Sequence, residues 1–152
     1  VIDYAHNPVS LKSVLAALAR YSHRRMICVF GCGGNRSVGR RYGMGLVSGI
    51  MADMTVITSD NPRWEDPETI MADIEKGVIA SGSNMYVKIP DRKKAIEFAL
   101  DSAGKGDMIL LAGKGHETYQ EICGQRIHMD ERELIRQILE EENGRIICRR
   151  DN

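Results

Sequence analysis

The sequence predicts an α/β fold, a three-layer sandwich in which helices cover both faces of a mostly parallel, Rossmann-like sheet. Short apolar runs alternate along the chain with longer segments whose apolar residues recur at helical spacing. The run at residues 26–30 is apolar throughout, as in a parallel strand that is buried on both faces. Such strands pair through right-handed crossovers, and the sheet binds ligands at the carboxyl ends of its strands. The loops that follow the strands are therefore where a functional site is expected.

Five strands and five helices account for the pattern. The strands are expected at residues 1–5, 26–30, 54–58, 85–89 and 108–112. The helices are expected at residues 8–21, 44–51, 67–80, 92–103 and 131–142. Residues 119–129, with Gly124 in their middle, are expected to form an edge strand or a hairpin. After Glu142 the helical spacing fails and Asn143-Gly144 indicates a stop, so residues 143–152 are expected to be a loose tail.

Several of the expected helices begin at recognisable capping residues. Asn7 and Asp66 are each followed by proline, whose missing N–H costs nothing at the first helical position. Asp130 and Glu133 have the spacing of a capping box.

The composition is that of one globular domain. Its 152 residues are 43% hydrophobic and 28% charged, which is enough for a single core. Lys and Arg together number 21, as do Asp and Glu, so no excess charge favours nucleic acid or an anionic membrane as a partner. No apolar run approaches the roughly 20 residues of a membrane span and no signal sequence opens the chain, which predicts a cytoplasmic protein. The chain begins at Val1 inside a strand pattern, so we expect a segment of a longer polypeptide.

The four cysteines form no metal-binding or disulfide pattern. Cys28, Cys32, Cys123 and Cys148 include no C-x-x-C pair. We expect buried free thiols in a reducing compartment, and no metal ligand in this chain.

The loop at residues 31–41 combines glycines with arginines. Arg36 stands where a dinucleotide-binding fingerprint requires its third glycine, so that fingerprint is absent. One interpretation is an anion-binding loop, in which glycine N–H groups act together with the cations of Arg36, Arg40 and Arg41. A solvated basic loop without a ligand explains the spacing equally well. The chain also has no G-x-x-x-x-G-K-[ST] motif, so a protein that uses ATP would hold its phosphates elsewhere.

The turn Asp60-Asn61-Pro62-Arg63 follows an apolar run with almost no spacer. Pro62 fixes the turn and restricts Asn61 to an extended conformation, so the neighbouring polar side chains are aimed in fixed directions. The guanidinium of Arg63 suits a carboxylate and the carboxylate of Asp60 suits an ammonium, which together fit the zwitterionic end of an amino acid. From the sequence alone, an Asx-turn with a surface arginine is the commoner explanation.

The loop Gly113-Lys114-Gly115-His116-Glu117 lies after the last strand of the predicted sheet. Glu117 and the backbone of Gly113 could supply a second contact to a zwitterion. A lone loop histidine is more often a hydrogen-bonded structural residue, so His116 is given no catalytic role.

A last polar group lies between the first strand and the first helix. Asp3, His6 and Asn7 occupy this position. Carboxylates at such strand ends accept ribose hydroxyls in other nucleotide folds, although helix capping by Asn7 explains part of the pattern.

Taken together, these loops are similar to those of the C-terminal domain of the Mur ligases, the ATP-dependent amide ligases that build the peptide of peptidoglycan. The resemblance covers nearly the whole chain. It rests on four motifs in the family's order: Asp3-Tyr4-Ala5-His6-Asn7-Pro8, Gly31-Cys32-Gly33-Gly34-Asn35-Arg36, Asp60-Asn61-Pro62-Arg63 and Gly113-Lys114-Gly115-His116-Glu117. It implies that residues 1–142 are the amino-acid-binding domain, and that the UDP-sugar and central ATPase domains lie outside this chain.

The resemblance also implies the reaction and the roles of the loop residues. In the family, ATP activates a substrate carboxylate as an acyl phosphate, which the amine of the incoming amino acid attacks. ATP, Mg²⁺ and UDP-MurNAc-L-Ala-D-Glu would then be bound mainly by the missing domains, and the segment alone is expected to be inactive. The implied nucleotide contacts are Asp3, His6 and Asn7. The implied amino-acid contacts are Arg36, Asp60, Asn61, Arg63, Gly113 and Glu117; no residue is assigned a catalytic role.

The resemblance selects the amino acid through Arg63. Meso-diaminopimelate differs from lysine by a second carboxylate, which is costly to bury without a partner. In the family the Asp-Asn-Pro-Arg motif accompanies diaminopimelate and lysine-adding members lack this arginine, so meso-diaminopimelate is the expected substrate. The loop near Arg36 departs from the family pattern, with Ser37 in place of Asp, Arg40 in place of Lys and Tyr42 in place of Pro.

Two other functions are compatible with these residues. A folylpolyglutamate synthetase shares a motif like Ala5-His6-Asn7-Pro8 and would use glutamate. A free-standing module that binds an amino acid or nucleotide without turnover is the alternative from another class. A Gly-Lys-Thr phosphate loop upstream of Val1 would indicate a ligase.

Overall fold

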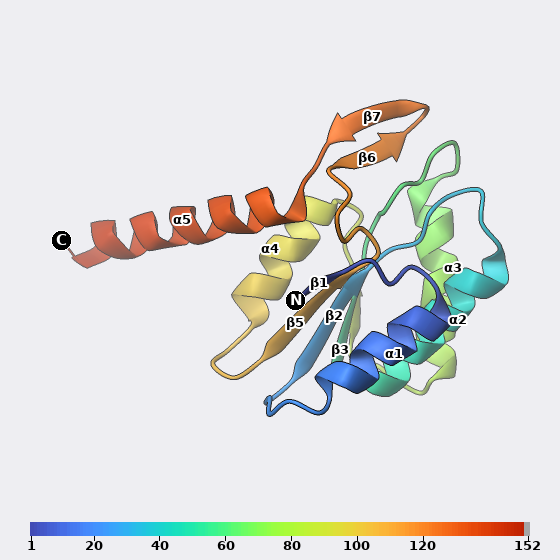
Figure 1. The fold of residues 1–152 in the computed structure, drawn as a ribbon, viewed down its shortest axis with the longest axis horizontal. Helices are drawn as coiled ribbons and strands as arrows, with labels where there is room; N and C mark the ends of the chain where they lie inside the picture. The colour runs from blue at the N-terminus through green and yellow to red at the C-terminus, as the bar shows by residue number, and fades with distance from the viewer. Residues whose placement is uncertain (151–152) are drawn as a thin grey trace.

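The computed structural model describes the backbone of residues 1–150 and the side chains of residues 1–141. Within this part, a five-stranded parallel sheet has the strand order β1-β5-β2-β3-β4 (Figure 1). The strands are β1 (Ile2–Asp3), β2 (Met26–Phe30), β3 (Met54–Ile57), β4 (Tyr86–Lys88) and β5 (Met108–Ala112). The predicted α/β class and parallel sheet are confirmed.

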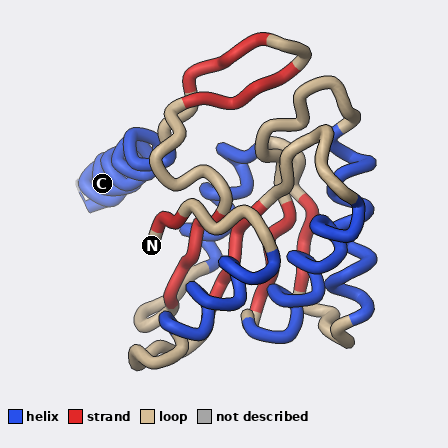
Figure 2. Tube along the Cα trace, turned by 45° about the vertical axis from the view of Figure 1, so that its right-hand side comes forward, coloured by secondary structure: helices blue, strands red, loops and turns tan. Residues whose placement is uncertain are grey.

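Helices flank the sheet on both faces. They are α1 (Pro8–Leu18), α2 (Val38–Met51), α3 (Pro67–Ala80), α4 (Arg92–Ser102) and α5 (Glu131–Arg150). Helices α1, α2 and α3 cover one face, while α4 and the start of α5 cover the other (Figure 1, Figure 2). None of the helices in the described part is both long and apolar enough to cross a bilayer.

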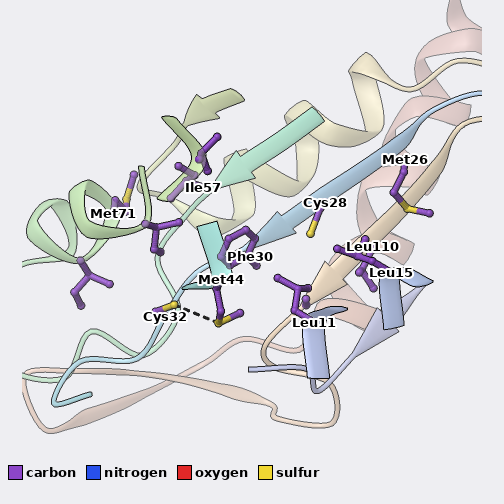
Figure 3. Packing of buried hydrophobic residues seen from close by; sticks show 14 residues of the cluster. Leu11, Leu15, Met26, Cys28, Phe30, Cys32, Met44, Ile57, Met71 and Leu110 are labelled. Carbon is purple, nitrogen blue, oxygen red and sulfur yellow. Dashed lines mark hydrogen bonds between the residues drawn. The ribbon is translucent and has the colours of Figure 1, made fainter. Parts of the chain in front are cut away.

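Strand β2 contributes to two separate hydrophobic cores. Cys28 and Phe30 pack with side chains of α1, α2 and α3 (Figure 3), whereas Ile27 and Val29 pack with those of α4 and α5. Successive side chains of a strand point to opposite faces, so a strand covered on both faces must be apolar at every position. This is why the strand reads as an unbroken apolar run.

The predicted cap of α1 is present, and that of α3 as well. The Asn7 Oδ1 atom accepts the backbone N–H of Ser10 at 2.9 Å, and the Ser10 hydroxyl accepts the N–H of Asn7 at 3.3 Å, which closes a capping box. At α5 the second half of the predicted capping box, a contact of the Glu133 side chain with the backbone of Asp130, is replaced by another contact. The Glu133 carboxylate lies 2.7 Å from Nε2 of His128 in the preceding hairpin.

Helix α2 starts at Val38, earlier than the sequence predicts. Its cap is Ser37, whose hydroxyl accepts the N–H of Arg40 at 3.3 Å. The sequence conceals this start because the first six residues of the helix include two glycines and two arginines, without a run of apolar residues at helical spacing. Farther along the helix, a Cβ on Gly45 would lie 2.0 Å from the carbonyl oxygen of Ile74 in α3. Glycine there lets the two helix backbones touch, at the expense of the apolar spacing that marks a helix.

Helix α5 continues past the stop that the sequence predicts. Its backbone is helical to Arg150, so the expected end at Asn143-Gly144 is wrong. One interior glycine costs a helix only about 1 kcal/mol relative to alanine, which does not by itself end it. The side chains from residue 142 onward and the whole of residues 151–152 lie outside the described part, so the loose packing expected of residues 143–152 stays a prediction.

Residues 119–129 form a hairpin rather than an edge strand of the main sheet. Strands β6 (Tyr119–Ile122) and β7 (Gln125–His128) pair antiparallel. Cys123 and Gly124 make the turn, with φ angles of 49° and 75°. The hairpin stands beyond the loops at the carboxyl edge of the sheet (Figure 2).

Two of the cysteines are buried free thiols, as expected. Burial raises the pKa of both Cys28 and Cys32 to about 12. Cys123 is exposed, because it lies in the hairpin turn, so the expected burial is wrong there. The side chain of Cys148 lies outside the described residues.

Candidate functional site

A polar pocket opens at the carboxyl edge of the sheet, among the loops that follow β1, β2, β3 and β5. Its volume is about 100 Å³, enough for the charged head group of a ligand. The lining residues are Tyr4, His6, Gly33, Arg36, Arg40, Asp60, Asn61, Arg63, Gly113 and Glu117. All six residues predicted to contact an amino acid are in this set, together with one of the three predicted nucleotide contacts, His6. Their roles in binding stay predictions.

The other two predicted nucleotide contacts, Asp3 and Asn7, do not line the pocket. The Asp3 Oδ1 atom accepts the N–H of Ala5 at 2.8 Å, and Asn7 caps α1. Both side chains shape the turn between β1 and α1. That turn brings Tyr4 and His6 to the pocket, with their ring centroids 4.7 Å apart.

The loops after β2 and β3 touch backbone to backbone beside the pocket. The Gly34 N–H donates to the Asn61 carbonyl at 2.8 Å. A Cβ on Gly31 would lie 2.2 Å from the Thr58 carbonyl oxygen, and one on Gly34 would lie 2.0 Å from that of Pro62. Glycine is therefore required here by the contact between two loops, whether or not the loop binds an anion.

Substituting Gly34→Ala is expected to lower the free energy of unfolding by about 1–3 kcal/mol, the usual cost of forcing extra atoms into a packed contact. Urea denaturation of the chain measures this. The matched control is Gly39→Ala in the first turn of α2, where an added Cβ meets no atom within 4 Å. Alanine there should be neutral or slightly stabilising, because it is the better helix former. Equal free energies of unfolding for the two variants would contradict the loop contact.

The arginines that follow the glycine-rich loop are of two kinds. Arg36 and Arg40 line the pocket. Arg41 is buried, with its guanidinium 2.7 Å from the Glu65 carboxylate and 3.3 Å from that of Asp73. Its expected role as a loop cation is wrong, because the early start of α2 turns this position toward α3. Arg41 joins α2 to α3 and to the turn before α3, and Arg36 and Arg40 are the two arginines after the glycine-rich loop that line the pocket.

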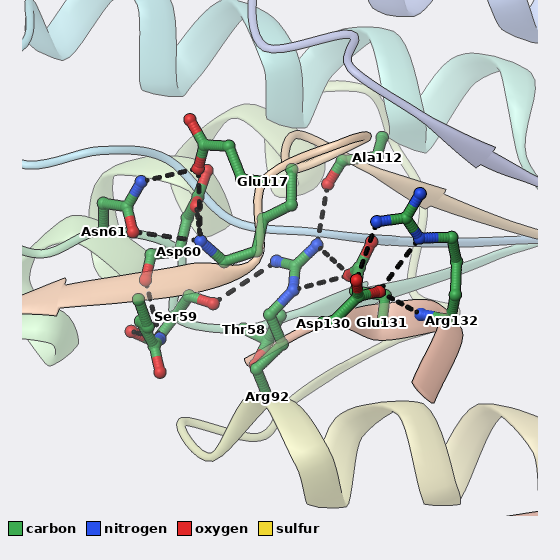
Figure 4. Close-up of polar contacts among 12 residues, drawn as sticks. Thr58, Ser59, Asp60, Asn61, Arg92, Ala112, Glu117, Asp130, Glu131 and Arg132 are labelled. Carbon is green, nitrogen blue, oxygen red and sulfur yellow. Dashed lines mark hydrogen bonds and ion pairs between the residues drawn. The ribbon is translucent and has the colours of Figure 1, made fainter. Parts of the chain in front are cut away.

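A buried lysine behind the pocket wall was not predicted from the sequence. Lys114 Nζ lies 3.2 Å from Asp60 Oδ1 and 3.4 Å from Glu117 Oε2. It also donates to Asn61 Oδ1 at 2.9 Å, and the Asn61 amide donates to Glu117 Oε2 at 2.9 Å. Figure 4 shows Asp60, Asn61 and Glu117 gathered in this network. The carboxylates of the pocket are therefore fixed in position before any ligand arrives.

Arg63 is held through both its backbone and its side chain. Its φ of 54° is left-handed, which is uncommon for a residue with a Cβ. Its N–H donates to the Glu121 carbonyl at 3.0 Å and its carbonyl accepts the N–H of Cys123 at 2.7 Å, so the hairpin fixes the backbone. The Nη1 atom donates to the Gly34 carbonyl at 2.6 Å. The turn before Arg63 is buried, and Arg63 itself is held by these contacts. The structure therefore differs from the alternative of a surface arginine on an Asx-turn.

Two more residues hold the pocket loops in place. Gln120 of the hairpin donates to the Asp60 carbonyl at 2.6 Å. Arg92 of α4 donates to the carbonyls of Ser59 at 3.3 Å and Ala112 at 2.9 Å, which lie directly before pocket residues (Figure 4). Neither belongs to a recognisable motif, so the sequence offered no signal for them.

The pocket thus presents both signs of charge to a ligand. Asp60 and Glu117 supply carboxylates, and Arg36, Arg40 and Arg63 supply guanidinium groups. Such a set suits a zwitterion, because carboxylates bind ammonium groups and guanidinium groups bind carboxylates. In the part of the chain with described side chains, no cluster of three or more His, Cys, Asp or Glu could hold a metal ion.

A Rossmann-like sheet with a small pocket of mixed charge at its carboxyl edge is typical of the α/β domains that bind ligands at their strand ends. The chain belongs to the Mur ligase family: residues 1–115 match the family model described as Mur ligase, glutamate ligase domain.

Relatives are similar over almost the whole chain. A UDP-N-acetylmuramoyl-L-alanyl-D-glutamate–2,6-diaminopimelate ligase of Caldanaerobacter subterraneus subsp. tengcongensis is 49% identical over 140 residues, which cover 92% of this chain and 29% of the relative. The enzyme of the same name from Prochlorococcus marinus (strain NATL1A) is 48% identical over 139 residues, 91% of this chain and 27% of the relative. This chain therefore spans less than a third of the length of these relatives.

Solved structures show the same fold. A structure of a UDP-N-acetylmuramoyl-L-alanyl-D-glutamate–2,6-diaminopimelate ligase superposes with a TM-score of 0.87 at 43% identity, covering 94% of this chain and 29% of that one. The FolC protein of E. coli in complex with ADP gives a TM-score of 0.55 at 18% identity, covering 76% of this chain and 26% of that one. The second likeness shows a shared fold alone.

Proposed function

We propose that this chain is the amino-acid-binding C-terminal domain of an ATP-dependent ligase that adds meso-diaminopimelate to UDP-MurNAc-L-Ala-D-Glu in peptidoglycan synthesis. The observation that carries the proposal is the pocket in which two fixed carboxylates lie beside three guanidinium groups. Relatives at 48–49% identity whose names state this reaction support the same substrate. We propose the cytoplasm as the place of the reaction.

The proposed part of this chain in the reaction is to bind and orient the incoming amino acid. ATP, when bound to the whole protein, supplies the phosphoryl group that activates a substrate carboxylate as an acyl phosphate. The carboxylates of Asp60 and Glu117 would hold an ammonium end of the amino acid, with Asn61 and the backbone of Gly113 beside them. Holding this end of the amino acid in a fixed place orients its other amino group, which would attack the acyl carbon as the neutral amine, since positioning removes much of the entropic cost of a reaction between two molecules.

The second carboxylate of meso-diaminopimelate would bind to the arginines of the pocket. Arg63 is the main candidate, because its guanidinium is already oriented by the Gly34 carbonyl. Arg36 and Arg40 add further positive charge to the same pocket. L-lysine lacks this carboxylate, so its binding would leave Arg63 with only its contacts to the Gly34 carbonyl and to the Glu121 carboxylate, which lies 3.4 Å from Nε.

ATP and Mg²⁺ are proposed to be bound mainly by parts of the protein outside this chain. The chain contains no G-x-x-x-x-G-K-[ST] motif. Asp3, His6 and Asn7 fit contacts at the edge of a nucleotide, with the ribose of ATP as their proposed partner. Asp3 uses its Oδ1 atom for the Ala5 N–H, which leaves its second oxygen for a hydroxyl.

Turnover by the full-length protein that carries this chain tests the proposal. The protein is incubated with ATP, Mg²⁺ and UDP-MurNAc-L-Ala-D-Glu, and separately with meso-diaminopimelate, L-lysine or L-glutamate. We expect phosphate release and a tripeptide product with meso-diaminopimelate and far less with L-lysine. Addition of glutamate to a folate would support the folylpolyglutamate alternative, and binding without turnover would support a non-catalytic module.

Residues 1–152 alone, under the same conditions, are expected to form no product. The reason is that the phosphate-binding loop and the UDP-sugar site are not in this chain. Phosphate release and mass spectrometry of the nucleotide-sugar measure the outcome. A product formed by the isolated chain would contradict the proposed division of roles.

A further inference from the structure

Lys114 is a lysine with no exposed surface, in a loop at the carboxyl edge of the sheet. Lysine is almost never fully buried unless it is paired. Its ammonium is enclosed by oxygen atoms from three segments: residues 60–61, its own loop and the first strand of the hairpin. It does not line the pocket, so it acts on a ligand only through these neighbours.

The distances show how the ammonium distributes its N–H groups. Its shortest contacts go to neutral oxygens, the Tyr119 carbonyl at 2.7 Å and Asn61 Oδ1 at 2.9 Å. The carboxylates lie farther away, Asp60 Oδ1 at 3.2 Å and Glu117 Oε2 at 3.4 Å. An ammonium has only three N–H donors, and the third goes to Glu117 Oε2, so Asp60 Oδ1 is left with an ion pair alone.

Lys114 is the one cation among the described residues in ion-pair contact with Asp60 and Glu117. The three arginines that line the same pocket pair with neither carboxylate, so in direct contact one positive charge faces two negative charges. The side chain of Asp60 is 8% exposed and that of Glu117 is 17% exposed, so water screens the excess negative charge poorly. Among the described residues, the buried Asp60 Oδ1 atom accepts no well-directed hydrogen bond; its contact with Lys114 is an ion pair only. A buried charge without full compensation is costly, and a cationic group entering the pocket would relieve that cost.

We propose that Lys114 is a positioning residue for the incoming amino acid, and that it holds the Asp60 and Glu117 carboxylates together while leaving them one positive charge short. The ammonium group of the substrate supplies that charge. This inference rests on the proposed function, because it concerns the same pocket and the same ligand. It explains why a cation is placed behind a site that must attract another cation: without Lys114, the two carboxylates would repel one another and turn away from the pocket.

A purely structural role for Lys114 makes a different prediction. A lysine that only stabilises the loops would, when replaced, lower stability and affect every substrate to a similar extent. A positioning residue would affect the amino acid selectively, and its effect would depend on the carboxylates through which it acts.

The test uses Lys114→Met in the full-length protein, with steady-state kinetics for each substrate in turn. The KM for the amino acid is expected to rise on the order of tenfold or more, the size of coupling found between neighbouring charged groups. The KM values for ATP and the nucleotide-sugar should stay near those of the wild type, and kcat at saturating amino acid should change less than KM. Lys114→Gln is the second variant: it keeps a hydrogen-bond donor without the charge and should show the same selective rise.

Two controls separate positioning from loss of stability. Ile74→Ala, in the core between α3 and the sheet, lowers the melting temperature without touching the pocket, and its KM for the amino acid should be unchanged. A double-mutant cycle adds Glu117→Gln. In that background Lys114→Met should raise the KM by a smaller factor, because one of the two carboxylates it compensates is already neutral.

The outcomes decide between the proposals. An unchanged KM for the amino acid in Lys114→Met or Lys114→Gln, or an equal rise in Ile74→Ala, would overturn the positioning role. The KM is measured with whichever amino acid the wild type adds. If that amino acid is not meso-diaminopimelate, the diaminopimelate assignment is overturned, but the test of Lys114 can still be carried out. A wild type that adds none overturns both.

Discussion

Replacing Arg63 with alanine in the full-length protein is expected to raise the KM for meso-diaminopimelate by a factor on the order of 100 or more. Removing the partner of a buried charge typically costs about 3–5 kcal/mol, and about 1.4 kcal/mol is tenfold in binding. The side chain is 25% exposed, so the lower end of that range is expected. The loss is still large because the guanidinium is oriented in advance by the Gly34 carbonyl at 2.6 Å.

Steady-state kinetics with meso-diaminopimelate and with L-lysine measure this effect. L-lysine lacks the second carboxylate, so we expect the wild type to use it poorly. Arg63→Ala should use L-lysine about as poorly as the wild type does. The preference for meso-diaminopimelate should therefore fall with the loss of Arg63. Arg63→Lys keeps the charge without the planar fork and should recover only part of the affinity.

Two further variants control for the backbone and for charge. The φ of Arg63 is 54°, a region that alanine enters at a cost of roughly 1–2 kcal/mol, whereas asparagine tolerates it better. Arg63→Asn should therefore raise the KM for meso-diaminopimelate as much as Arg63→Ala does, with a smaller loss of stability. Arg126→Ala removes an exposed hairpin arginine, which lies over the ring of Tyr119, and should leave the KM unchanged. Normal use of meso-diaminopimelate by Arg63→Ala would refute the assignment of the second carboxylate.

Substituting Arg92→Met is expected to lower the free energy of unfolding by about 3–5 kcal/mol, the usual cost of breaking a buried ion pair from one side. Arg92 Nη2 lies 2.8 Å from Glu131 Oε1, and both side chains are only 1% exposed. The variant leaves the Glu131 carboxylate buried without its cation. It also removes the donor to the Ser59 and Ala112 carbonyls, which lie at the start of two pocket loops.

Urea denaturation of residues 1–152 measures the loss. The double variant Arg92→Met, Glu131→Leu should be more stable than Arg92→Met alone, because no buried charge is then left without a partner. Lys93→Met is the control for the neighbouring position: its contact with Glu97 is 3.8 Å long and exposed, so its removal should cost only about 0–1 kcal/mol. A free energy of unfolding for Arg92→Met within 1 kcal/mol of the wild type would contradict the buried pair.

Most of the fold could be predicted because its signals are local. Strands β2 and β5 are short apolar runs, and their bounds match the prediction at both ends. The start of α2 could not be predicted, because residues 38–43 include Gly39 and Gly43 and carry no run of apolar residues at helical spacing. The end of α5 was misread because Asn143-Gly144 is a common stop that a helix can nevertheless accommodate.

The candidate site could be predicted in outline, because parallel strands bring their carboxyl ends to one edge. The motif at residues 60–63 and the loop at residues 113–117 meet there, as the topology requires. Lys114 could not be predicted, although it lies inside one of those motifs. Its partner Asn61 is 53 residues away, and nothing near Lys114 in the chain shows that it is buried.

The sequence by itself determined the α/β class, the caps of α1 and α3, and the loops that carry the pocket. Helical spacing, capping residues and apolar runs depend on neighbours a few residues away, so they are readable along the chain. The tertiary structure decided what each charged side chain does. Arg41 turns inward to Glu65 and Asp73, Arg63 is held at the pocket, and Lys114 is enclosed behind it. Burial of a charge depends on partners brought by distant segments, and only the folded chain places those partners.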